Sequence, residues 1–251
     1  MSADGSAENN PADKKNERFE ELLRNESGDG EAPAIPAATV VVLRDTDDGV
    51  QTLMLRKNSK IAFGGMWVFP GGKIDDDDHD ESGEILAAAR QAAVREAHEE
   101  ARLEVEVETL VMFSHWIPPT IAPKRFATWF FAARVDAEHA VIDDGEIVDM
   151  EWTTPASCLA RHHEGEIEIV PPTWVTLHTL RDYRTVAEAL ADLAARPPRH
   201  FATRVAKGRN GRIVMWQGDA AYDSDDPDAE GSRHRIEMRE TGWVYDDSGA
   251  I

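Results

Sequence analysis

The sequence predicts an α/β protein, and three observations lead to this prediction. Short apolar stretches typical of strands alternate along the chain with segments of helical periodicity. A chain of 251 residues with 41% hydrophobic content is long enough to bury a sizeable core. Neither an internal repeat nor a convincing linker interrupts it, so the elements are expected to pack together.

The first elements follow a polar amino-terminal segment. Residues 1–33 are polar and charged, with scattered Gly, Ala and Pro, so we expect a disordered acidic tail. Two strands joined by a turn-rich segment are predicted at residues 35–43 and 50–55. The first is nearly continuous in apolar residues, which indicates burial on both faces. A third short apolar stretch ends at the glycines Gly71 and Gly72.

The middle of the chain continues the alternation of helices and strands. Helical periodicity runs over residues 84–101. Further strands are predicted at residues 103–111, where apolar and charged residues alternate strictly, and at residues 127–135 and 146–152. A short helix follows, which Thr154 can cap and in which Pro155 fits the first turn.

Residues 165–251 are predicted to form an α+β extension that packs on the preceding domain. Residues 171–183 have a helical pattern after two prolines, and a capping box of Thr185 and Glu188 opens the next helix. Asn210-Gly211 between two apolar runs indicates a β-hairpin. Two more strands are predicted at residues 233–238 and 242–245.

Charge and composition exclude several classes of protein. The formal net charge is −21, and no cluster of basic residues supplies the footprint that a nucleic-acid backbone requires. A single cysteine, Cys158, rules out an internal disulfide and fits a reducing compartment. The chain lacks an apolar run of ~20 residues and an apolar signal core, so we expect a cytoplasmic protein that does not enter membranes.

Three glutamates stand close together in the predicted helix. At ~3.6 residues per turn, Glu96, Glu99 and Glu100 share one face and repel each other, a cost that a bound divalent cation would remove. The alternative is a solvated face with one ion pair between Arg95 and Glu99. The side chains on the opposite face of the helix are small enough to let it lie close against a sheet. They belong to Ala89, Ala92, Ala93, Val94 and Ala97.

The segments VFPGGK and REAHEEARL resemble the Nudix box. Its usual form is a glycine, five residues, a glutamate, seven residues, then Arg-Glu-hydrophobic-x-Glu-Glu-x-Gly-hydrophobic. The positions that carry the match are Gly72, Arg95, Glu96, Glu99 and Glu100. The resemblance extends to about Leu159 through HWIPPTIAPKRFATWFF and GEIVDMEWTTPASCL, which are similar to the Nudix branch that includes acyl-coenzyme A diphosphatases.

This resemblance implies a Nudix-type α/β/α sandwich with a mixed sheet over residues 34–164. It also implies hydrolysis of a nucleoside diphosphate linked to another moiety, with Mg²⁺ or Mn²⁺ as cofactor. Branch resemblance suggests coenzyme A or acyl-coenzyme A, while a nucleotide sugar or a dinucleotide stays open.

The family's functional residues can be carried over position by position. The implied metal ligands are Glu96, Glu99, Glu100 and the carbonyl of Gly71. Arg95 would orient a glutamate, and Glu146 would be a further metal ligand or the general base. Gly72 and Lys73 would lie at the diphosphate. Apart from the family pattern, Arg125 with Phe126 and Trp129 could line a substrate pocket, and the alternative is that at least one of the two aromatic residues belongs to the core. The sequence does not separate the general base from the metal ligands.

The chain departs from the family pattern in two places. The segment between Gly72 and Arg95 is longer than usual. The family pattern expects a glutamate eight residues before Arg95, but this position is Ala87, so Glu84 would have to take the role of that glutamate. Arg102 replaces the glycine that ends the helix, at a cost of about 1–2 kcal/mol if the backbone turns left-handed there. The alternative function is therefore a degenerate Nudix domain that binds a nucleotide or a protein without turnover. The acidic run DDDDHDE in the longer segment is expected to be a solvated loop.

Overall fold

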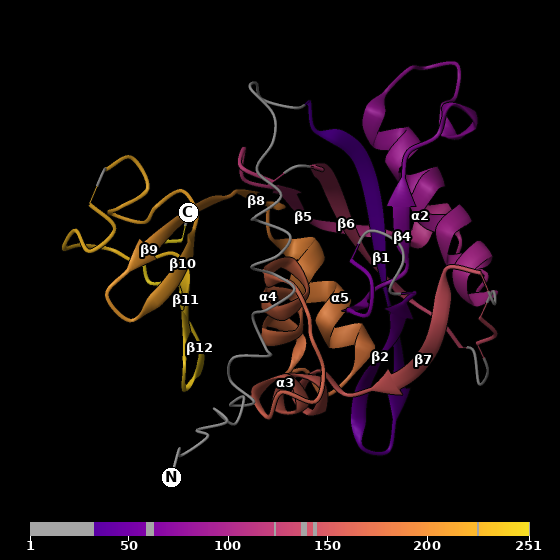
Figure 1. Cartoon of the computed structure of the whole chain (residues 1–251). Helices are drawn as coiled ribbons and strands as arrows, with labels where there is room; N and C mark the ends of the chain where they lie inside the picture. Colours follow the sequence, from indigo (N-terminus) through magenta and orange to yellow (C-terminus); the bar gives the residue numbers. More distant parts are fainter. Residues whose placement is uncertain are drawn as a thin grey trace, which may run out of the picture.

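The computed structural model describes residues 33–58, 63–122, 124–136, 140–142, 145–224 and 226–250. The predicted tail, residues 1–33, lies outside them except for its last residue. A mixed sheet forms the centre of the molecule, with helices on both faces and a second, smaller sheet at one side (Figure 1). The predicted α/β class and the layers of helix, sheet and helix are confirmed.

Eight strands make up the central sheet. They are β1 (Ile35–Thr46), β2 (Gly49–Lys57), β3 (Trp67–Val68), β4 (Gly71–Lys73), β5 (Val111–Ile117), β6 (Phe126–Arg134), β7 (Ile147–Thr153) and β8 (Arg199–Ala202). The order is β3-β2-β1-β6-β5-β8, with β4 beside β1 and β7 beside β2. β1 is parallel to β6, and β5 is parallel to β8, whereas the other pairs are antiparallel.

Strand β1 contributes side chains to the hydrophobic core on each side of the sheet. Val40 and Val42 belong to the core under the helix of residues 85–101. Val41 and Leu43 belong to the core on the opposite face of the sheet. All four are fully buried. Successive side chains of a strand point to opposite faces, so an apolar run without alternation is what a strand with two covered faces requires.

In the described part of the chain, four α-helices cover this sheet. They are α2 (Ile85–Ala101), α3 (Pro155–His163), α4 (Pro171–Leu180) and α5 (Val186–Ala195), and η1 (Asp76–Asp78) and η2 (Val107–Thr109) are short 3₁₀ turns. Helix α2 lies on one face and the other three lie on the opposite face (Figure 1). The hydroxyls of Thr154 and Thr185 each accept a hydrogen bond from a backbone amide three residues later, at 3.2 Å, so both threonines cap their helices. The other half of the predicted capping box differs, because the Glu188 carboxylate accepts from the amide of Arg184 at 3.2 Å.

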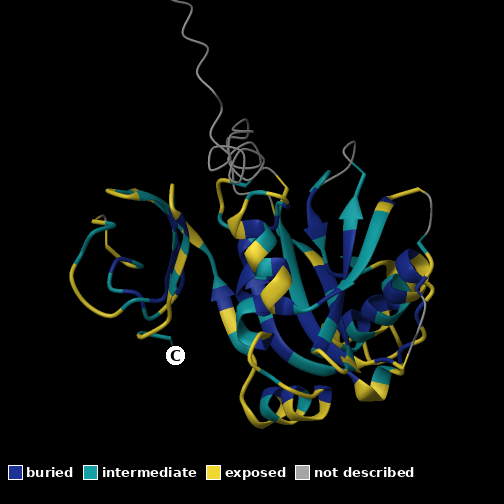
Figure 2. Cartoon of the chain, turned by 90° about the horizontal axis from the view of Figure 1, so that it is seen from below, coloured by how far each residue is buried: buried dark blue, intermediate teal, exposed yellow. Residues whose placement is uncertain are grey.

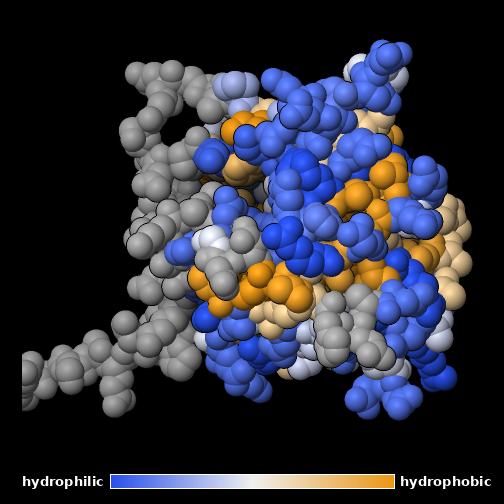
Figure 3. Space-filling view, turned by 90° about the vertical axis from the view of Figure 1, so that its right-hand side faces the viewer, coloured by the Kyte–Doolittle hydropathy of each residue, from blue (hydrophilic) through white to orange (hydrophobic). Residues whose placement is uncertain are grey.

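Burial follows these layers. Buried residues are concentrated in the central strands and on the sides of the helices that face them (Figure 2). The side of the molecule at the right of Figure 1, where α2 and β7 lie, is mostly hydrophilic, with hydrophobic side chains in bands between (Figure 3). Within the described ranges, every helix is too short or too polar to span a membrane.

The predicted strand at residues 103–111 is wrong. Burial alternates as expected, with Leu103 and Val105 buried and Glu104 and Glu106 exposed, but this backbone pairs with no strand in the described part of the chain and ends in η2. The paired strand, β5, begins only at Val111. Alternating polarity reports which side chains are buried, whereas a strand also needs a neighbouring backbone.

The carboxy-terminal part adds a small antiparallel sheet. Its strands are β9 (Arg204–Gly208), β10 (Gly211–Met215), β11 (Arg235–Arg239) and β12 (Gly242–Asp246). The predicted hairpin at Asn210-Gly211 joins β9 to β10. Gly211 has a φ of 138°, and a Cβ there would lie 2.2 Å from the carbonyl oxygen of Met238, so glycine is required.

Aromatic side chains join the two sheets. Strand β8, which the sequence patterns did not predict, pairs with β5 and brings Phe201 onto Trp116, with ring centroids 3.7 Å apart and planes 3° apart. Trp216, just after β10, meets both rings edge-on, and its indole NH donates to the Thr203 hydroxyl at 3.1 Å. The core of the central sheet therefore continues into the smaller one. The division of the chain at residue 164 stays a prediction.

We predict that Phe201→Ala lowers the free energy of unfolding by about 3–5 kcal/mol, because it removes a buried aromatic ring from the junction of the two sheets. Urea unfolding followed by tryptophan fluorescence measures the change. Val244→Ala, at an exposed position of β12, is the control and should cost less than about 1 kcal/mol. Equal losses in the two variants would contradict the importance of the aromatic junction.

Candidate active site

Helix α2 carries the three glutamates and lies close to the sheet. Alanines fill its buried side, and the fully buried ones are Ala88, Ala89, Ala92, Ala93, Ala97 and Ala101. Short side chains let a helix axis approach a sheet closely. The helix therefore brings Glu96 and Glu100 to the edge of β4, where Gly71 and Gly72 lie.

Each glycine of β4 permits a contact that a larger residue would block. A Cβ on Gly72 would lie 2.1 Å from Oε1 of Glu96, so this carboxylate rests directly against the backbone. A Cβ on Gly71 would lie 2.5 Å from the hydroxyl of Thr39. The amide of Gly71 donates to Oε2 of Glu100 at 3.0 Å. The role of the Gly71 carbonyl as a metal ligand stays a prediction.

The three glutamates differ in burial and therefore in electrostatics. The side chains of Glu96 and Glu100 are 14% and 7% exposed, whereas that of Glu99 is 55% exposed. Burial, and then the charge of Glu100, raises the pKa of Glu96 to about 7. Burial also raises the pKa of Glu100, against the opposing effect of Lys57. In the metal-free site the surroundings therefore disfavour the charged forms of both carboxylates.

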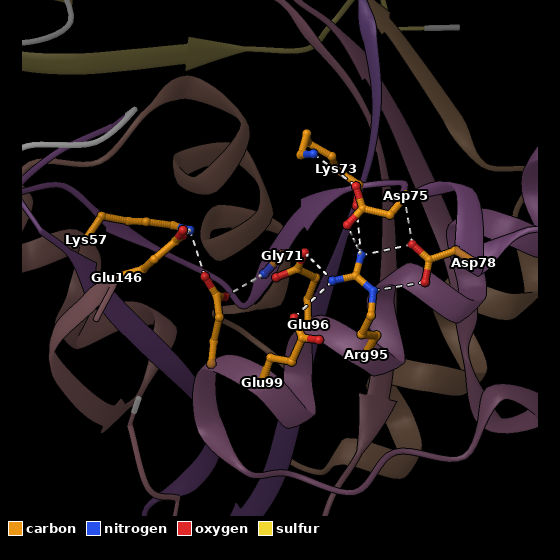
Figure 4. A network of polar contacts seen from close by, with 10 residues as sticks. Lys57, Gly71, Lys73, Asp75, Asp78, Arg95, Glu96, Glu99 and Glu146 are labelled. Carbon is orange, nitrogen blue, oxygen red and sulfur yellow. Dashed lines mark hydrogen bonds and ion pairs between the residues drawn. The ribbon is translucent and has the colours of Figure 1, made fainter. Parts of the chain in front are cut away.

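Lys57, which the sequence patterns did not single out, joins Glu146 to this cluster. Its ammonium lies 2.7 Å from Oε1 of Glu100 and 3.7 Å from Oε2 of Glu146 (Figure 4). The backbone of Glu146 is held in place because its carbonyl accepts a hydrogen bond from the amide of Asn58 at 2.8 Å. The structure therefore brings together Glu146 and the glutamates of α2, which are far apart in the sequence.

Arg95 lies at the centre of a second group of carboxylates. Its guanidinium makes two parallel hydrogen bonds of 2.9 Å to Asp78, a pair with the geometry of a strong charge-assisted contact (Figure 4). The same group contacts Glu96 at 2.9 Å and Glu99 at 3.0 Å. Burial alone would raise the pKa of Asp78, but the hydrogen bonds from Arg95 and from the Asp75 amide outweigh it and lower that pKa.

Asp78 corrects two expectations from the sequence. The acidic run is not solvated throughout, because Asp78 is 6% exposed and anchored to Arg95. Counted forward from Gly72, it also stands where the family pattern has its first glutamate, after five residues. The extra residues therefore lie between Asp78 and α2, and neither Ala87 nor Glu84 takes that place. Glu84 precedes the first residue of α2.

Helix α2 ends at Arg102 in a left-handed conformation. Arg102 has φ 54° and ψ 32°, so the backbone makes the turn for which the family pattern has glycine. The amide of Leu103 donates to the carbonyl of Ala97 at 3.2 Å, and that of Arg102 donates to His98 at 2.9 Å. The non-glycine residue costs about 1–2 kcal/mol but leaves the direction of the chain unchanged.

The two side chains expected to contact substrate, Lys73 and Arg125, each contact other groups of the protein. The ammonium of Lys73, 59% exposed, is 2.9 Å from Asp75 in the acidic loop. Arg125 lies just before β6, and its guanidinium donates to the carbonyl of Pro118 at 3.2 Å, whereas the glutamates lie on α2. Arg125 is next to Ile35 at the start of β1, whose amide donates to the Arg125 carbonyl at 2.7 Å.

Carboxylates of this kind fit a hard divalent cation. Burial disfavours the charged forms of Glu96 and Glu100, and a cation bound by their oxygen atoms would favour those forms. As the side chains lie, no three groups of His, Cys, Asp or Glu among the described residues converge closely enough to hold a metal ion. The Glu100 carboxylate contacts Lys57. Figure 4 shows Glu96 and Glu99 in contact with Arg95.

Comparison with known proteins identifies the fold around this site. A family model described as the NUDIX domain matches residues 34–173, which is more than half of the chain. The chain belongs to the Nudix hydrolase family. The predicted Nudix fold and hydrolase class are thereby confirmed. A search of curated proteins finds no match.

Solved structures similar to this Nudix hydrolase include one from Alicyclobacillus acidocaldarius. That NUDIX hydrolase has 21% identity and a TM-score of 0.58, over 67% of this chain and 100% of its own, and this likeness concerns the fold. The NUDIX domain of Shewanella oneidensis NrtR complexed with ADP ribose has 20% identity and a TM-score of 0.43, over 56% and 86%. A C. elegans Ap4A hydrolase binary complex has 19% identity and a TM-score of 0.40, over 58% and 93%.

For this Nudix hydrolase we predict that Asp78→Asn lowers the free energy of unfolding by about 2 kcal/mol, because the Arg95 guanidinium loses its bidentate carboxylate. Asp77→Asn changes the exposed neighbour in the same turn and should stay within about 0.5 kcal/mol of the parent protein. Urea unfolding at neutral pH measures both. A cost for Asp78→Asn no larger than that for Asp77→Asn would contradict the anchoring role.

A second prediction concerns pH. The pKa of Glu96 rises from 4.5 to about 7 on folding, so the folded protein binds this proton more tightly and the metal-free protein loses stability as the pH rises from about 4.5 to about 7. Relative to Glu96→Gln, the parent protein in chelator should lose roughly 3–5 °C in Tm between pH 5 and pH 8. Glu108→Gln, at an exposed position, should follow the parent profile. Identical profiles for parent and Glu96→Gln would refute the assignment.

Proposed function

We propose that this protein hydrolyses a nucleoside diphosphate linked to another moiety, using Mg²⁺ or Mn²⁺ held by Glu96, Glu99 and Glu100. The observation that carries the proposal is the placement of two carboxylates, the buried Glu100 and the largely buried Glu96, against the two glycines of β4. A purely structural helix has no use for mutually repelling carboxylates in a buried position. A site that binds a cation and a diphosphate requires them.

The chemistry follows from the charges. A diphosphate repels both water and an acidic protein, and divalent cations bound by these carboxylates would neutralise it and lower the pKa of a bound water. Glu96 and Glu100 would supply metal ligands from one face of α2. Glu99, which faces solvent, would be the third ligand. Arg95, anchored by Asp78, keeps Glu96 and Glu99 oriented.

The proton from the attacking water needs an acceptor. Glu146 is a candidate for the general base, because its side chain is 68% exposed and still faces Glu100 across Lys57. One of the three glutamates of α2 is the other candidate. Exchange of each carboxylate for an amide in turn, with the pH profile of kcat, separates a base from a ligand.

Coenzyme A or an acyl-coenzyme A is the substrate that we propose to test first. Support comes from the similarity of the segments around Trp116 and Arg125 to the acyl-coenzyme A diphosphatase branch. Arg125 and the backbone around Gly72 and Lys73 are the proposed substrate contacts. A nucleotide sugar and a dinucleotide are the other candidate substrates, and a cytoplasmic location stays a prediction.

The alternative of a binding module without turnover rests on two departures from the family pattern. The structure weakens both, because Asp78 pairs with Arg95 in place of the expected glutamate and Arg102 makes the left-handed turn in place of glycine. With its carboxylates intact, the domain has the groups that hydrolysis requires. No observation in the described part of the chain favours the binding module.

We predict that purified protein cleaves at least one of these diphosphates in Mg²⁺ or Mn²⁺ but not in chelator, as read by product chromatography. Glu99→Gln should reduce kcat on the order of 100-fold or more while the fold is retained, since Glu99 is 55% exposed. Glu104→Gln, at an 86% exposed position just beyond α2, is the control and should retain full activity. Full activity of Glu99→Gln would refute the site assignment, and binding of a diphosphate without any cleavage would favour the binding module.

A further inference from the structure

Lys57 occupies a position where a charged residue is unexpected. It is the last residue of β2, and alternation along that strand puts it on the same face as Leu53 and Leu55, which are fully buried under α2. Its side chain is only 12% exposed. A buried ammonium is costly unless carboxylates pair with it, so the site has to supply partners.

Those partners are two carboxylates already in the proposed site. The ammonium of Lys57 lies 2.7 Å from Oε1 of Glu100 and 3.7 Å from Oε2 of Glu146. Oε2 of Glu100 accepts the amide of Gly71. Each oxygen of Glu100 therefore has a donor, and the one that Lys57 holds is the one that a metal ion would have to take over or share.

We propose that Lys57 is the resident counter-cation of this site: it holds Glu100 beside Glu146 when no metal is bound, and it competes with a divalent cation for Glu100. The inference rests on the proposed function, since it assigns the metal to the glutamates of α2. It makes Lys57 a positioning residue, which keeps the carboxylates gathered and lowers the affinity for metal.

The two cationic residues of the site differ in their anchors. Arg95 is held by Asp78 through two hydrogen bonds and also donates to the backbone carbonyl of Lys73 at 3.0 Å, so it can stay in place while Glu96 turns. The Lys57 ammonium is bound by Glu100 and Glu146, the carboxylates that face the metal site. A flexible chain with a compact charge is suited to such an exchange, whereas a planar guanidinium in a bidentate pair is not.

Removal of the Lys57 charge should therefore strengthen metal binding. Calorimetric titration of Mn²⁺ into substrate-free protein measures the Kd without any need for turnover. We expect Lys57→Met to bind Mn²⁺ about tenfold more tightly than the parent protein, because the positive charge beside the proposed ligand Glu100 is gone. The same variant should have a lower Tm in chelator, since Glu100 is left buried without its partner.

Two matched variants separate this role from a general effect of charge. Lys57→Arg keeps the positive charge and should bind Mn²⁺ no more tightly than the parent protein, because a guanidinium beside Glu100 still opposes the metal. Lys207→Met removes the same side chain from an exposed position on β9 and should change neither. A structure of the parent protein with Mn²⁺ gives a test that requires no variant, because the Lys57 ammonium should have left Oε1 of Glu100.

Several outcomes would overturn the inference. Mn²⁺ binding by Lys57→Met that equals the parent affinity or is weaker would do so, as would a Mn²⁺-bound structure in which the 2.7 Å contact persists. An unchanged Kd with a raised KM for the diphosphate would make Lys57 a substrate contact instead. If the parent protein binds no Mn²⁺ at all, the proposed function fails together with this inference, whereas normal binding with an unaffected variant overturns this inference alone.

Discussion

The close approach of α2 to β4 is the constraint on which the proposed site depends. Alanines on the helix and glycines on the strand remove the atoms that would keep the two backbones apart, and Glu96 then fits against Gly72 where even a methyl group would not. Close packing makes this arrangement rigid, because a packed core resists small displacements. Burial follows from the same approach, and burial raises the pKa values of Glu96 and Glu100.

Two different cationic side chains form ion pairs with those carboxylates. Arg95 ties α2 to the acidic loop through Asp78, so the segment inserted between Asp78 and α2 does not disturb the geometry of the helix. Lys57 reaches the site from the other side and joins Glu100 to Glu146. Arg95 is thus the structural anchor, through a bidentate guanidinium. Lys57 is the exchangeable counter-charge, through a flexible ammonium.

The carboxy-terminal part shares a core with the central sheet. Strand β8 extends that sheet beside β5, and the stack of Trp116 on Phe201, closed by Trp216, carries hydrophobic contact into the four-stranded sheet. Aromatic rings in stacked and edge-on arrangements bury a large area with defined geometry. The strand is only four residues long and its apolar side chains do not alternate over a long run, so its pairing partner decides its conformation.

Local patterns in the sequence determined the fold class, the buried strand β1, the helix α2, the caps at Thr154 and Thr185 and the glutamate-bearing face, because each depends on residues within about two turns of one another. Tertiary structure alone decided that Lys57 and Asp78 join the site. Both reach it from segments outside α2, and no spacing rule relates them to the helix, whereas Glu146 was expected there only through the family resemblance and Arg95 meets Glu99 by helical spacing. Tertiary structure also decided that residues 103–111 do not form a strand, because alternation specifies burial but backbone hydrogen bonds require a neighbour that only the assembled fold supplies.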